Sequence, residues 1–464
     1  MEFTVVISIL YLVASALFIL GLKRMGSPAT ARTGNLLAAI AMLLAVIGVL
    51  IEREVVSYWI IALAMVLGSG IGALVARTIK MTAMPQLVGL LNGLGGGASG
   101  LVASAEFMRL WSASEQADLD VSISIVFASL IGWVTVSGSV IAFFKLQELM
   151  SGRAIRFFMQ KSINLVLFLL IIGLGSYLVW GEFSLPVFYA IILLSLLLGV
   201  LLVLPIGGAD MPVVISLLNS YSGLAAATAG FVLRNPVLII GGTLVAAAGL
   251  ILTQIMCKAM NRSLFNVMFG AFGAQTVSKG KASPDVGKSV RDVSAEDAAI
   301  ALAYARSVIF VPGYGLAVSQ AQHHVRELAE LLESRNVLVK YAIHPVAGRM
   351  PGHMNVLLAE ANVPYDKLYD LDQVNDEFDR TDVAVVIGAN DVVNIAARDV
   401  PSSPIYGMPI LNVDHAQNVL VIKRSLSPGF AGIDNDLFYK DKTMMFFSDA
   451  KEGLIKIIGE IKSI

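Results

Sequence analysis

Cysteine and charged residues are both scarce in this chain. Cys257 is the only cysteine among 464 residues, so no internal disulfide and no cysteine-based metal cluster can form, and we expect no metal site. Charged residues make up 14% of the sequence and hydrophobic ones 56%, which excludes an ordinary soluble enzyme. The net charge of −1 argues against bulk nucleic-acid binding, so nucleic acid is not an expected partner.

The shortage of charge is uneven along the chain. Residues 1–270 carry 24 charged residues, about 9% of that part, whereas the last 194 residues carry 43, about 22%. We therefore predict a transmembrane domain over 1–262, a linker over 263–293 and a soluble domain over 294–464. No cleavable targeting signal is evident, because the apolar run Phe3–Leu22 is long enough to span and follows no basic residue.

The apolar part predicts an α-helical integral membrane domain with about nine transmembrane helices. A spanning helix needs about 20 mostly apolar residues. The candidate spans are roughly 3–22, 35–51, 55–76, 84–105, 122–146, 163–180, 186–207, 211–233 and 237–256.

Basic residues between the spans predict the orientation. With the first loop in the cytoplasm, only Arg53, Arg109 and Arg234 lie on the opposite side, and eleven basic residues lie on the cytoplasmic side. Those eleven are Lys23, Arg24, Arg32, Arg77, Lys80, Lys145, Arg153, Arg156, Lys161, Lys258 and Arg262. An odd number of spans then places the N-terminus outside and the soluble domain in the cytoplasm.

Two spans contain an internal repeat. Met84–Asn92, followed by Gly96, resembles Met211–Asn219, followed by Gly223, at an offset of 127 residues. Each copy places a lone Asn in mid-helix before small residues. The Asn side chains either hydrogen-bond between packed helices or line a water-filled path, and in both cases they must face protein or water rather than lipid.

No obvious proton carrier lies in the middle of the predicted spans. All five histidines belong to the soluble part, and no charged residue sits deep in a span. Asp210, just before the second repeat, is either a helix N-cap or the cytoplasmic mouth of a proton path. Protons crossing here would need water beside Asn and Ser groups, or a titratable group from a partner. The candidate proton path comprises Asn92, Ser139, Asp210 and Asn219.

The last third of the chain predicts a soluble α/β Rossmann-like domain with a doubly wound parallel sheet. A polar, turn-rich stretch over Ala282–Lys288 precedes a helix that begins at Ser294, with Asp297 as its capping-box partner. A helix-like stretch covers Ala317–Ser334. The predicted strands are Ser307–Val311, Val337–Ile343, Val383–Ile387, Ile410–Val413 and Val419–Ile422.

The first of these strands runs into Gly313-Tyr-Gly-Leu-Ala-Val318, close to the dinucleotide fingerprint G-x-G-x-x-G but with Val318 in place of the third Gly. Glycines there allow a tight turn and close approach to a pyrophosphate, which the N-terminus of the following helix also favours. The alternative is a plain turn between a strand and a helix.

The cofactor preference depends on charge. The second predicted strand leads into His344 without an Asp or Glu that would bind the ribose of NAD, which fits NADP. Lys423 and Arg424, with Ser425, end what we interpret as the last strand, beside the glycine-rich stretch after it. The pair is either a solvated edge or a phosphate site.

Taken together, these motifs resemble the beta subunits of bacterial proton-translocating NAD(P) transhydrogenases over essentially the whole chain. The matching segments are Pro312–Val318, His344–Asn355, Gly388–Asp391, Lys423–Ser425 with Gly429–Gly432, Gly208–Pro212 through Asn219–Gly223, and Met256–Arg262.

The resemblance implies a Re/Si-specific enzyme of the bacterial inner (plasma) membrane that transfers hydride directly from NADH to NADP+, coupled to proton movement into the cytoplasm. The cofactors supply the hydride chemistry. The chain shows one dinucleotide fingerprint, so NADP(H) would bind here and NAD(H) on a partner alpha subunit with further membrane helices. This chain alone would be inactive, and the alpha-beta unit would form a dimer in the lipid bilayer.

The resemblance also implies the site residues. The pyrophosphate and nicotinamide end would be held by Gly313, Tyr314, Gly315, Ala317, Val318, Ala347, Gly348 and Arg349, and the 2′-phosphate by Lys423, Arg424 and Ser425. A lid would include Gly429, Gly432, Asp434 and Asn435, and the nicotinamide would lie near Gly388, Asn390 and Asp391. Asp391, Asn390 and Arg349 are the expected catalytic residues. Asp391 would link protonation to NADP(H) affinity; its structural alternative is a helix N-cap.

One departure from the family bears on the proton path. Some members carry a membrane histidine where this sequence has Asn92. In others, chiefly those whose alpha part is split into two chains, an equivalent histidine belongs to the partner, and we expect that arrangement here.

The alternative function is a transporter or ion channel regulated by a cytoplasmic nucleotide-sensing Rossmann domain. Composition, helix count and orientation fit it equally well. The Arg349 motif, the Lys423–Ser425 motif and the repeated helices favour the transhydrogenase.

Overall fold

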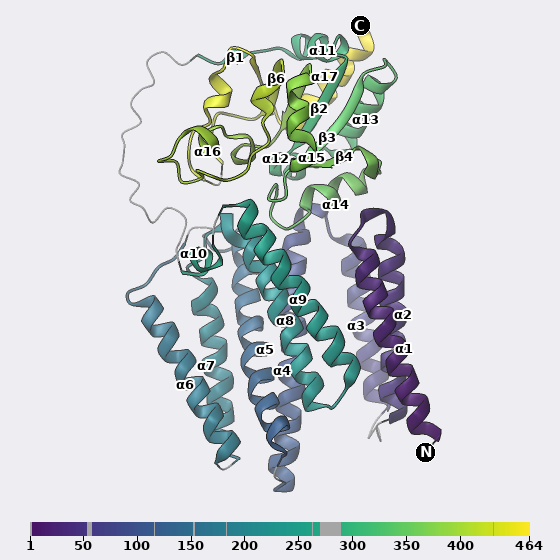
Figure 1. Ribbon diagram of the computed structural model, residues 1–464, viewed down its shortest axis with the longest axis vertical. Helices are drawn as coiled ribbons and strands as arrows, with labels where there is room; N and C mark the ends of the chain where they lie inside the picture. The colour runs from purple at the N-terminus through teal and green to yellow at the C-terminus, as the bar shows by residue number, and fades with distance from the viewer. Residues whose placement is uncertain are drawn as a thin grey trace. The chain divides into compact units, whose positions relative to one another are not determined.

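The computed structural model describes residues 2–52, 58–115, 117–151, 154–181, 183–261, 263–269, 289–429 and 431–464. Internal contacts divide the chain into two compact units (Figure 1). The first unit comprises Met1–Met150, Arg156–Pro205 and Ile215–Ile251, and the second comprises Ser151–Ile155, Ile206–Val214 and Leu252–Ile464.

Nine of the described helices are long and apolar enough to cross a membrane, which confirms the predicted helical membrane domain. They are α1 (Glu2–Met25), α2 (Pro28–Glu52), α3 (Tyr58–Thr78), α4 (Met84–Ala113), α5 (Leu119–Leu146), α6 (Gln160–Trp180), α7 (Leu185–Val203), α8 (Met211–Val232) and α9 (Pro236–Ala259). Short 3-10 turns η1 (Met81–Ala83) and η2 (Gly208–Asp210) precede α4 and α8.

Glycines set the distance between α4 and α5. A Cβ added to Gly132 of α5 would lie 2.6 Å from the carbonyl oxygen of Gly96 on α4, so the two backbones touch. The second repeat behaves alike, because a Cβ on Gly223 of α8 would lie 2.4 Å from the backbone nitrogen of Ala246 on α9. Gly96 and Gly223 are equivalent in the repeat. The small residues of the repeat therefore let each of these helices cross its neighbour closely, as in other membrane bundles.

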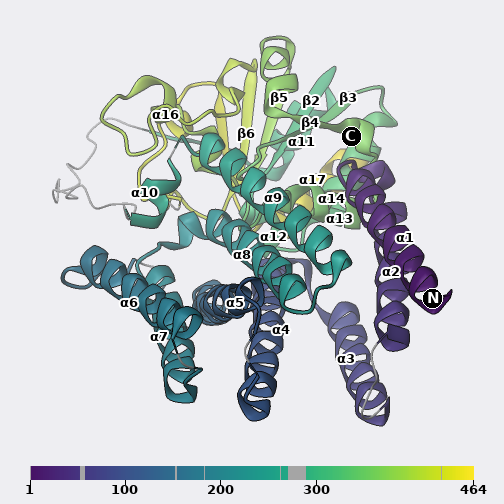
Figure 2. The same cartoon turned by 60° about the horizontal axis from the view of Figure 1, so that its bottom comes forward.

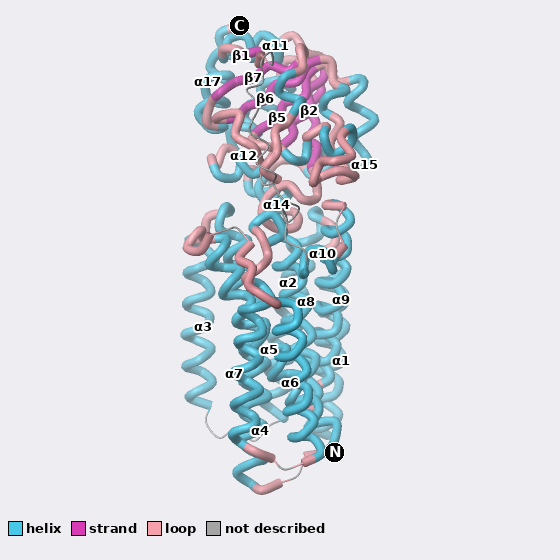
Figure 3. The backbone as a smooth tube through the Cα atoms, turned by 90° about the vertical axis from the view of Figure 1, so that its left-hand side faces the viewer, coloured by secondary structure: helices cyan, strands magenta, loops and turns pink. Residues whose placement is uncertain are grey.

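Aromatic and aliphatic side chains fill the rest of this core. Phe107 of α4 stacks on Phe188 of α7, with ring centroids 4.0 Å apart. Leu130, Val134 and Leu198 extend the same cluster along α5 and α7. By contrast, α3 has no buried residue among those described. The tube in Figure 3 shows the long helices running side by side, without strands.

The second unit contains a parallel sheet of seven strands in the order β1-β7-β6-β5-β2-β3-β4. Figure 2 shows the sheet, with β2 to β6 labelled. Every strand pair is parallel. The strands are β1 (Arg291–Asp292), β2 (Ser307–Pro312), β3 (Leu338–Ile343), β4 (Leu368–Asp370), β5 (Val383–Ile387), β6 (Asn418–Lys423) and β7 (Thr443–Phe447). After β4 the chain returns to the other side of β2, so a topological switch point lies between β2 and β5.

Helices and turns cover both faces of the sheet, which confirms the predicted Rossmann-like fold. Contacts place α11, α12, α13, α14 and α17 on one face, and α15, η4, η6 and η7 on the other. The helices are α10 (Leu264–Phe269), α11 (Ala295–Ala303), α12 (Tyr314–Val318), α13 (Gln322–Glu333), α14 (His353–Glu360), α15 (Leu371–Val374), α16 (Ala396–Asp399) and α17 (Ala450–Ser463). The 3-10 turns are η3 (Tyr365–Lys367), η4 (Asn375–Arg380), η5 (Asp391–Val393), η6 (Val413–His415) and η7 (Asp436–Tyr439).

The sequence correctly predicted the start of α11 but not the break in the later helix. Ser294 caps α11, and its hydroxyl and the Asp297 carboxylate form the expected capping box. The Asp297 pKa is lowered because its carboxylate accepts hydrogen bonds from the Ser294 side chain and backbone. The helix expected over Ala317–Ser334 is instead broken, because Gln320 adopts a left-handed conformation (φ 51°) between α12 and α13.

Ile410–Val413 is not a strand, and that prediction was wrong. Leu411 and Val413 are buried in the core cluster on one face of the sheet, so the apolar run packs onto the sheet instead of pairing within it. The strand that ends at Lys423, β6, is not the last strand as predicted. The apolar run Thr443–Phe447 forms β7 later in the chain, and the sequence analysis also missed β1 and β4.

The segment predicted as a linker contains α10 and β1. Residues 270–288, including the polar stretch Ala282–Lys288, lie outside the described residues. The predicted domain boundaries therefore stay predictions.

Replacing Gly132 with Val will destabilise the membrane unit by roughly 1–3 kcal/mol, because the added side chain overlaps the backbone of Gly96 on α4. The matched control is Gly173→Val on α6, where no atom lies within 4 Å of an added Cβ. Thermal unfolding of the purified chain in detergent measures both. Equal melting temperatures for the two variants would contradict the close α4–α5 crossing.

Candidate functional site

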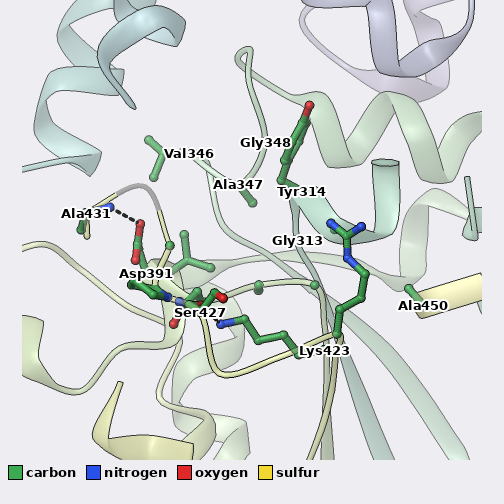
Figure 4. A pocket seen from close by; sticks show the side chains of 18 of the residues that line it. Gly313, Tyr314, Val346, Ala347, Gly348, Asp391, Lys423, Ser427, Ala431 and Ala450 are labelled. Atoms are coloured by element: carbon green, nitrogen blue, oxygen red, sulfur yellow. Dashed lines mark hydrogen bonds between the residues drawn. The ribbon is translucent and has the colours of Figure 1, made fainter. Parts of the chain in front are cut away.

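The second unit has a pocket at the switch point of its sheet, where β2, β5 and β6 end (Figure 4). Ligands of open α/β sheets bind outside the carboxyl ends of strands at such a point. Twelve predicted site residues line the pocket: Gly313, Tyr314, Gly315, Ala347, Gly348, Gly388, Asn390, Asp391, Lys423, Arg424, Ser425 and Gly429. Residues that are separated by more than 100 positions in the sequence are thus brought to one place.

Six predicted site residues do not line the pocket: Ala317, Val318, Arg349, Gly432, Asp434 and Asn435. Ala317 is fully buried and Val318 is 44% exposed. The sequence analysis missed a further set that does line it: Ser319, Val346, Ala389, Val392, Ile405, Met408, Ile422, Ser427, Pro428, Ala431, Ser448 and Ala450. Most of these carry small or apolar side chains and so gave no chemical signal.

Two glycine turns meet at the floor of the pocket. The Gly313 and Gly315 N–H groups donate to the carbonyls of Ile387 and Gly388, both at 2.9 Å. A Cβ on Gly388 would lie 2.4 Å from the Gly315 Cα, and Gly388 has φ +63°. Each turn therefore needs glycine for the contact between the ends of β2 and β5. This need is separate from the close approach of a ligand to the backbone.

Lys423 ends β6 on one wall of the pocket. Its Nζ donates to the Ser427 carbonyl and lies 4.9 Å from the Phe438 ring centroid. Burial lowers the pKa of Lys423, and the charges of Asp391 and Asp434 act in the opposite direction. Arg424 and Ser425 follow and are exposed. This wall therefore offers two cations and a hydroxyl to an anion.

Asp391 joins the end of β5 to the segment after β6. Its Oδ2 accepts a hydrogen bond from the Ala431 N–H at 2.9 Å, as Figure 4 shows. A Cβ on Gly429 would lie 2.4 Å from Asp391 Oδ1, so a larger residue there would have to displace this carboxylate. The N-cap of η5 is Asn390, so Asp391 is not the N-cap residue of that turn. The carboxylate instead holds the predicted lid; Phe430 in that lid lies outside the described residues.

Asn390 and Asn435 form a second set of hydrogen bonds that holds the same segment. Asn435 Nδ2 donates to the Asn390 carbonyl at 3.1 Å. One end of the Asn390 side-chain amide lies 3.2 Å from Lys423 Nζ and 2.7 Å from the Gly429 nitrogen. A residue that the sequence analysis missed, Asn394, is fully buried and donates to the Asp434 carbonyl at 3.0 Å.

Tyr314 forms another part of the lining, with Arg349 behind it. The Arg349 guanidinium stacks on the Tyr314 ring, 4.4 Å from the centroid. The turn that carries Arg349 is shaped by His353, whose Nδ1 accepts from the Arg349 N–H at 3.0 Å. Gly348 has φ +108°, and a Cβ there would lie 2.5 Å from the His353 ring. Arg349 therefore orients Tyr314 although it does not line the pocket.

His344 occupies the position after β3 where an NAD-binding fold would place its ribose-binding carboxylate. Burial lowers its pKa to about 4. Its Nε2 lies 2.8 Å from the Pro409 carbonyl and its Nδ1 accepts from the Val346 N–H. The imidazole is therefore neutral, with its proton on Nε2, and its ring nitrogens bond to the protein backbone.

Three of the four proton-path candidates belong to helices of the first unit. Asn92 of α4 is buried and its Nδ2 donates to the Ile215 carbonyl of α8 at 3.2 Å, one turn before the half-buried Asn219. Ser139 of α5 is 1% exposed, and a Cβ on Gly93 of α4 would lie 2.9 Å from its Cβ. Asn92 thus forms a hydrogen bond between the two copies of the repeat.

The fourth candidate, Asp210, belongs by its contacts to the second unit. It is fully buried at the end of η2, directly before α8. Its backbone N–H donates to the Gly207 carbonyl at 3.0 Å.

Known proteins are similar to this chain over nearly its whole length. The profile of the family described as "NAD(P) transhydrogenase beta subunit" matches residues 7–460. Two relatives named "NAD(P) transhydrogenase subunit beta", both from Rhodospirillum rubrum, are 50% identical over 456 residues, which cover 97% of this chain and 97% of theirs.

Gly388→Ala will lower the melting temperature of the chain far more than Gly432→Ala. Both positions have a left-handed φ, +63° and +70°, which costs an alanine roughly 1–2 kcal/mol. Only at Gly388 does the added carbon also overlap a neighbouring backbone, at 2.4 Å, whereas nothing lies within 4 Å at Gly432. Differential scanning calorimetry of the two variants compares them, and equal losses would disprove the contact between the two glycine turns.

Proposed function

Because this chain belongs to the NAD(P) transhydrogenase beta subunit family, we propose that its globular domain binds NADP(H) and that its helical domain moves protons. With an alpha subunit that binds NAD(H), it catalyses Re/Si-specific, direct hydride transfer from NADH to NADP+, coupled to proton movement into the cytoplasm. The alpha-beta unit forms a dimer in the bacterial inner membrane, with the N-terminus in the periplasm. The proposed domains are 1–262 and 294–464, joined by a linker over 263–293.

The pair Lys423–Arg424 at the rim of the switch-point pocket is the observation that carries the choice of NADP(H). A 2′-phosphate needs cationic donors, and an arginine can bind it through two N–H groups. Ser425 adds a hydroxyl donor to the same wall. At the end of β3, the neutral His344 leaves no carboxylate that would repel this phosphate. The lining residues therefore fit NADP(H) better than NAD(H).

The lid residues suggest how protonation is linked to cofactor binding. NADP+, when bound, supplies the hydride acceptor. Asp391 in its charged form accepts the Ala431 N–H and stabilises the ammonium of Lys423. Protonation of Asp391 removes that charge. It therefore weakens both the hydrogen bond to the Ala431 N–H and the stabilisation of the Lys423 ammonium. Asn390 holds the lid from the same turn, and Arg349 orients Tyr314.

The polar groups of the proposed proton path are Asn92, Ser139 and Asn219 of the helical unit, together with Asp210, which belongs by its contacts to the second unit. The Asn92 side chain is an amide rather than an imidazole, so it cannot take up and release a proton near neutral pH. A membrane histidine of the alpha subunit would supply that capacity. Water beside these groups carries the proton between titratable residues.

The complete enzyme tests the proposal. When this chain and its alpha subunit are reconstituted in vesicles with NADH and NADP+, we expect NADPH to form and the pH on the side of the globular domain to fall. Each subunit alone is the control and should give no turnover. Tight NADP(H) binding without any hydride transfer would leave the chain a nucleotide sensor.

Lys423→Met and Arg424→Met will each weaken NADP(H) binding by about 10- to 100-fold, since a hydrogen bond to a charged group contributes roughly 1.5–3 kcal/mol. Titration calorimetry of the full chain in detergent measures the dissociation constants. Lys456→Met, which removes an exposed lysine of α17, is the matched control and should bind as the unchanged chain does. Undiminished NADP(H) affinity in both site variants would remove the basis for the cofactor assignment.

A further inference from the structure

The pocket has a second end, away from the lid. Figure 4 shows Ala450 on the opposite side of the pocket from Asp391, which bonds the lid. Ser319, the residue after α12, and Ser448, the residue after β7, also line the pocket. We call Ser319, Ser448 and Ala450 the hydroxyl wall, because two of them carry a hydroxyl and none carries a charge. The proposed function assigns no role to these residues.

A hydrogen bond joins the end of α12 to the start of α17 at the hydroxyl wall. Ser319 Oγ donates to Asp449 Oδ2 at 2.9 Å. Asp449 is the N-cap residue of α17, and its Oδ1 accepts from the Lys451 N–H at 3.0 Å. One carboxylate therefore caps the helix and holds the serine hydroxyl at the same time. Because the cap fixes the carboxylate, the Ser319 side chain is held in one orientation as well.

This hydrogen bond determines what Ser319 can offer to a ligand. A hydroxyl has one hydrogen to donate and two lone pairs to accept with, whereas a carboxylate only accepts. Ser319 uses its hydrogen on Asp449, so its oxygen is left as an acceptor for a ligand. The hydroxyl wall therefore presents an acceptor that favours a ligand N–H group over a ligand carbonyl.

The adenosine half of NADP(H) would border the hydroxyl wall. The 2′-phosphate is attached to the adenosine ribose, and the proposed function places it at Lys423–Ser425. Lys423 pairs with Phe447 in the sheet, and the Ser448 N–H donates to the Lys423 carbonyl at 3.2 Å. β7, which leads into the wall, and β5, which leads into Asp391, flank β6 on opposite sides. A cofactor with its nicotinamide near Asp391 would therefore have its adenine on the side of the wall.

We propose that Ser319 is a specificity-determining residue that accepts a hydrogen bond from the amino group of the adenine base, with Asp449 as its positioning residue. The inference rests on the proposed function. Adenine carries an exocyclic amino group, which is a donor, where hypoxanthine carries a carbonyl oxygen. With hypoxanthine, the Ser319 oxygen and the carbonyl would face each other without a hydrogen between them. A site built around a hydrogen bond rejects an analogue that cannot form it.

The test compares NADP(H) with its hypoxanthine analogue by titration calorimetry of the full chain in detergent. We expect the unchanged chain to prefer NADP(H) by about tenfold, since a hydrogen bond contributes roughly 0.5–1.5 kcal/mol and an unpaired acceptor costs more. Ser319→Ala should reduce this preference to less than about threefold, and Ser319→Thr, which keeps the hydroxyl, should retain it. The matched control is Ser463→Ala, at an exposed serine of α17 whose hydroxyl donates to the Glu460 carbonyl.

Asp449→Ser tests the positioning role separately. Serine is also a favoured N-cap residue, so this variant keeps a cap on α17 but removes the carboxylate oxygen that accepts from Ser319. The Ser319 hydroxyl can then turn and donate to a carbonyl. We therefore expect the hypoxanthine analogue to bind almost as tightly as NADP(H) in this variant.

The outcomes separate base recognition from helix packing. An equal loss of affinity for both nucleotides in Ser319→Ala would assign Ser319 to the packing of α12 against α17 and would overturn the inference. Equal affinities of the unchanged chain for the two nucleotides would overturn it too, while the NADP(H) assignment would stand. If the unchanged chain bound neither nucleotide, the proposed function itself would fail. Loss of the preference in Ser319→Ala, with a normal control, is the result that the inference requires.

Discussion

Both units of this protein depend on backbones that touch without side chains between them. In the helical unit, Gly96 and Gly132 bring α4 and α5 into contact, and Gly223 does the same for α8 against α9. In the sheet unit, Gly315 and Gly388 bring the ends of β2 and β5 together. A Cβ at Gly132, Gly223, Gly315 or Gly388 would overlap backbone atoms, which cannot move as a flexible side chain can.

The glycine contact forms the floor of the pocket, and one wall carries side chains whose charge can change. Lys423 at the end of β6 is drawn toward its neutral form by burial and toward its charged form by Asp391 and Asp434. Asp391 at the same time bonds the backbone of the lid at Ala431. Under the proposed function, a change of charge at this one carboxylate would act on cofactor affinity and on the lid together. Such coupling is what an enzyme needs if proton movement is to control nucleotide binding.

The polar side chains of the helical unit lie among apolar helices, where water is scarce, so they need hydrogen-bond partners within the protein. Asn92 donates its amide hydrogen to the Ile215 carbonyl, and Ser216 and Ser220 of α8 donate their hydroxyls to carbonyls of α9. Lys145 of α5 likewise donates to a backbone carbonyl, that of Leu204.

Much of this arrangement could be predicted from local sequence. Apolar runs of sufficient length determined the nine helices, because a membrane-spanning backbone has to satisfy its own hydrogen bonds. Ser294 and Asp297 marked the start of α11, because capping is an interaction within four residues. The turn at Gly313 and the basic pair at Lys423 marked two edges of the pocket, since each combines a special residue type with the end of a β-branched run.

Other features were decided only by tertiary structure. Ile410–Val413 and Thr443–Phe447 are both short apolar runs, yet the first packs onto the sheet and the second pairs within it as β7. Their difference lies in which neighbour each one meets, and composition does not record that. Small apolar pocket residues such as Ile405 and Ala450 are likewise defined by position alone. Lys145 shows the same limit, because its place near the end of an apolar run resembles that of a loop residue although its side chain is buried. The sequence by itself determined which segments form helices and strands and where the charged groups lie along the chain; only packing decided which of those groups are buried together, because burial depends on contacts between distant segments.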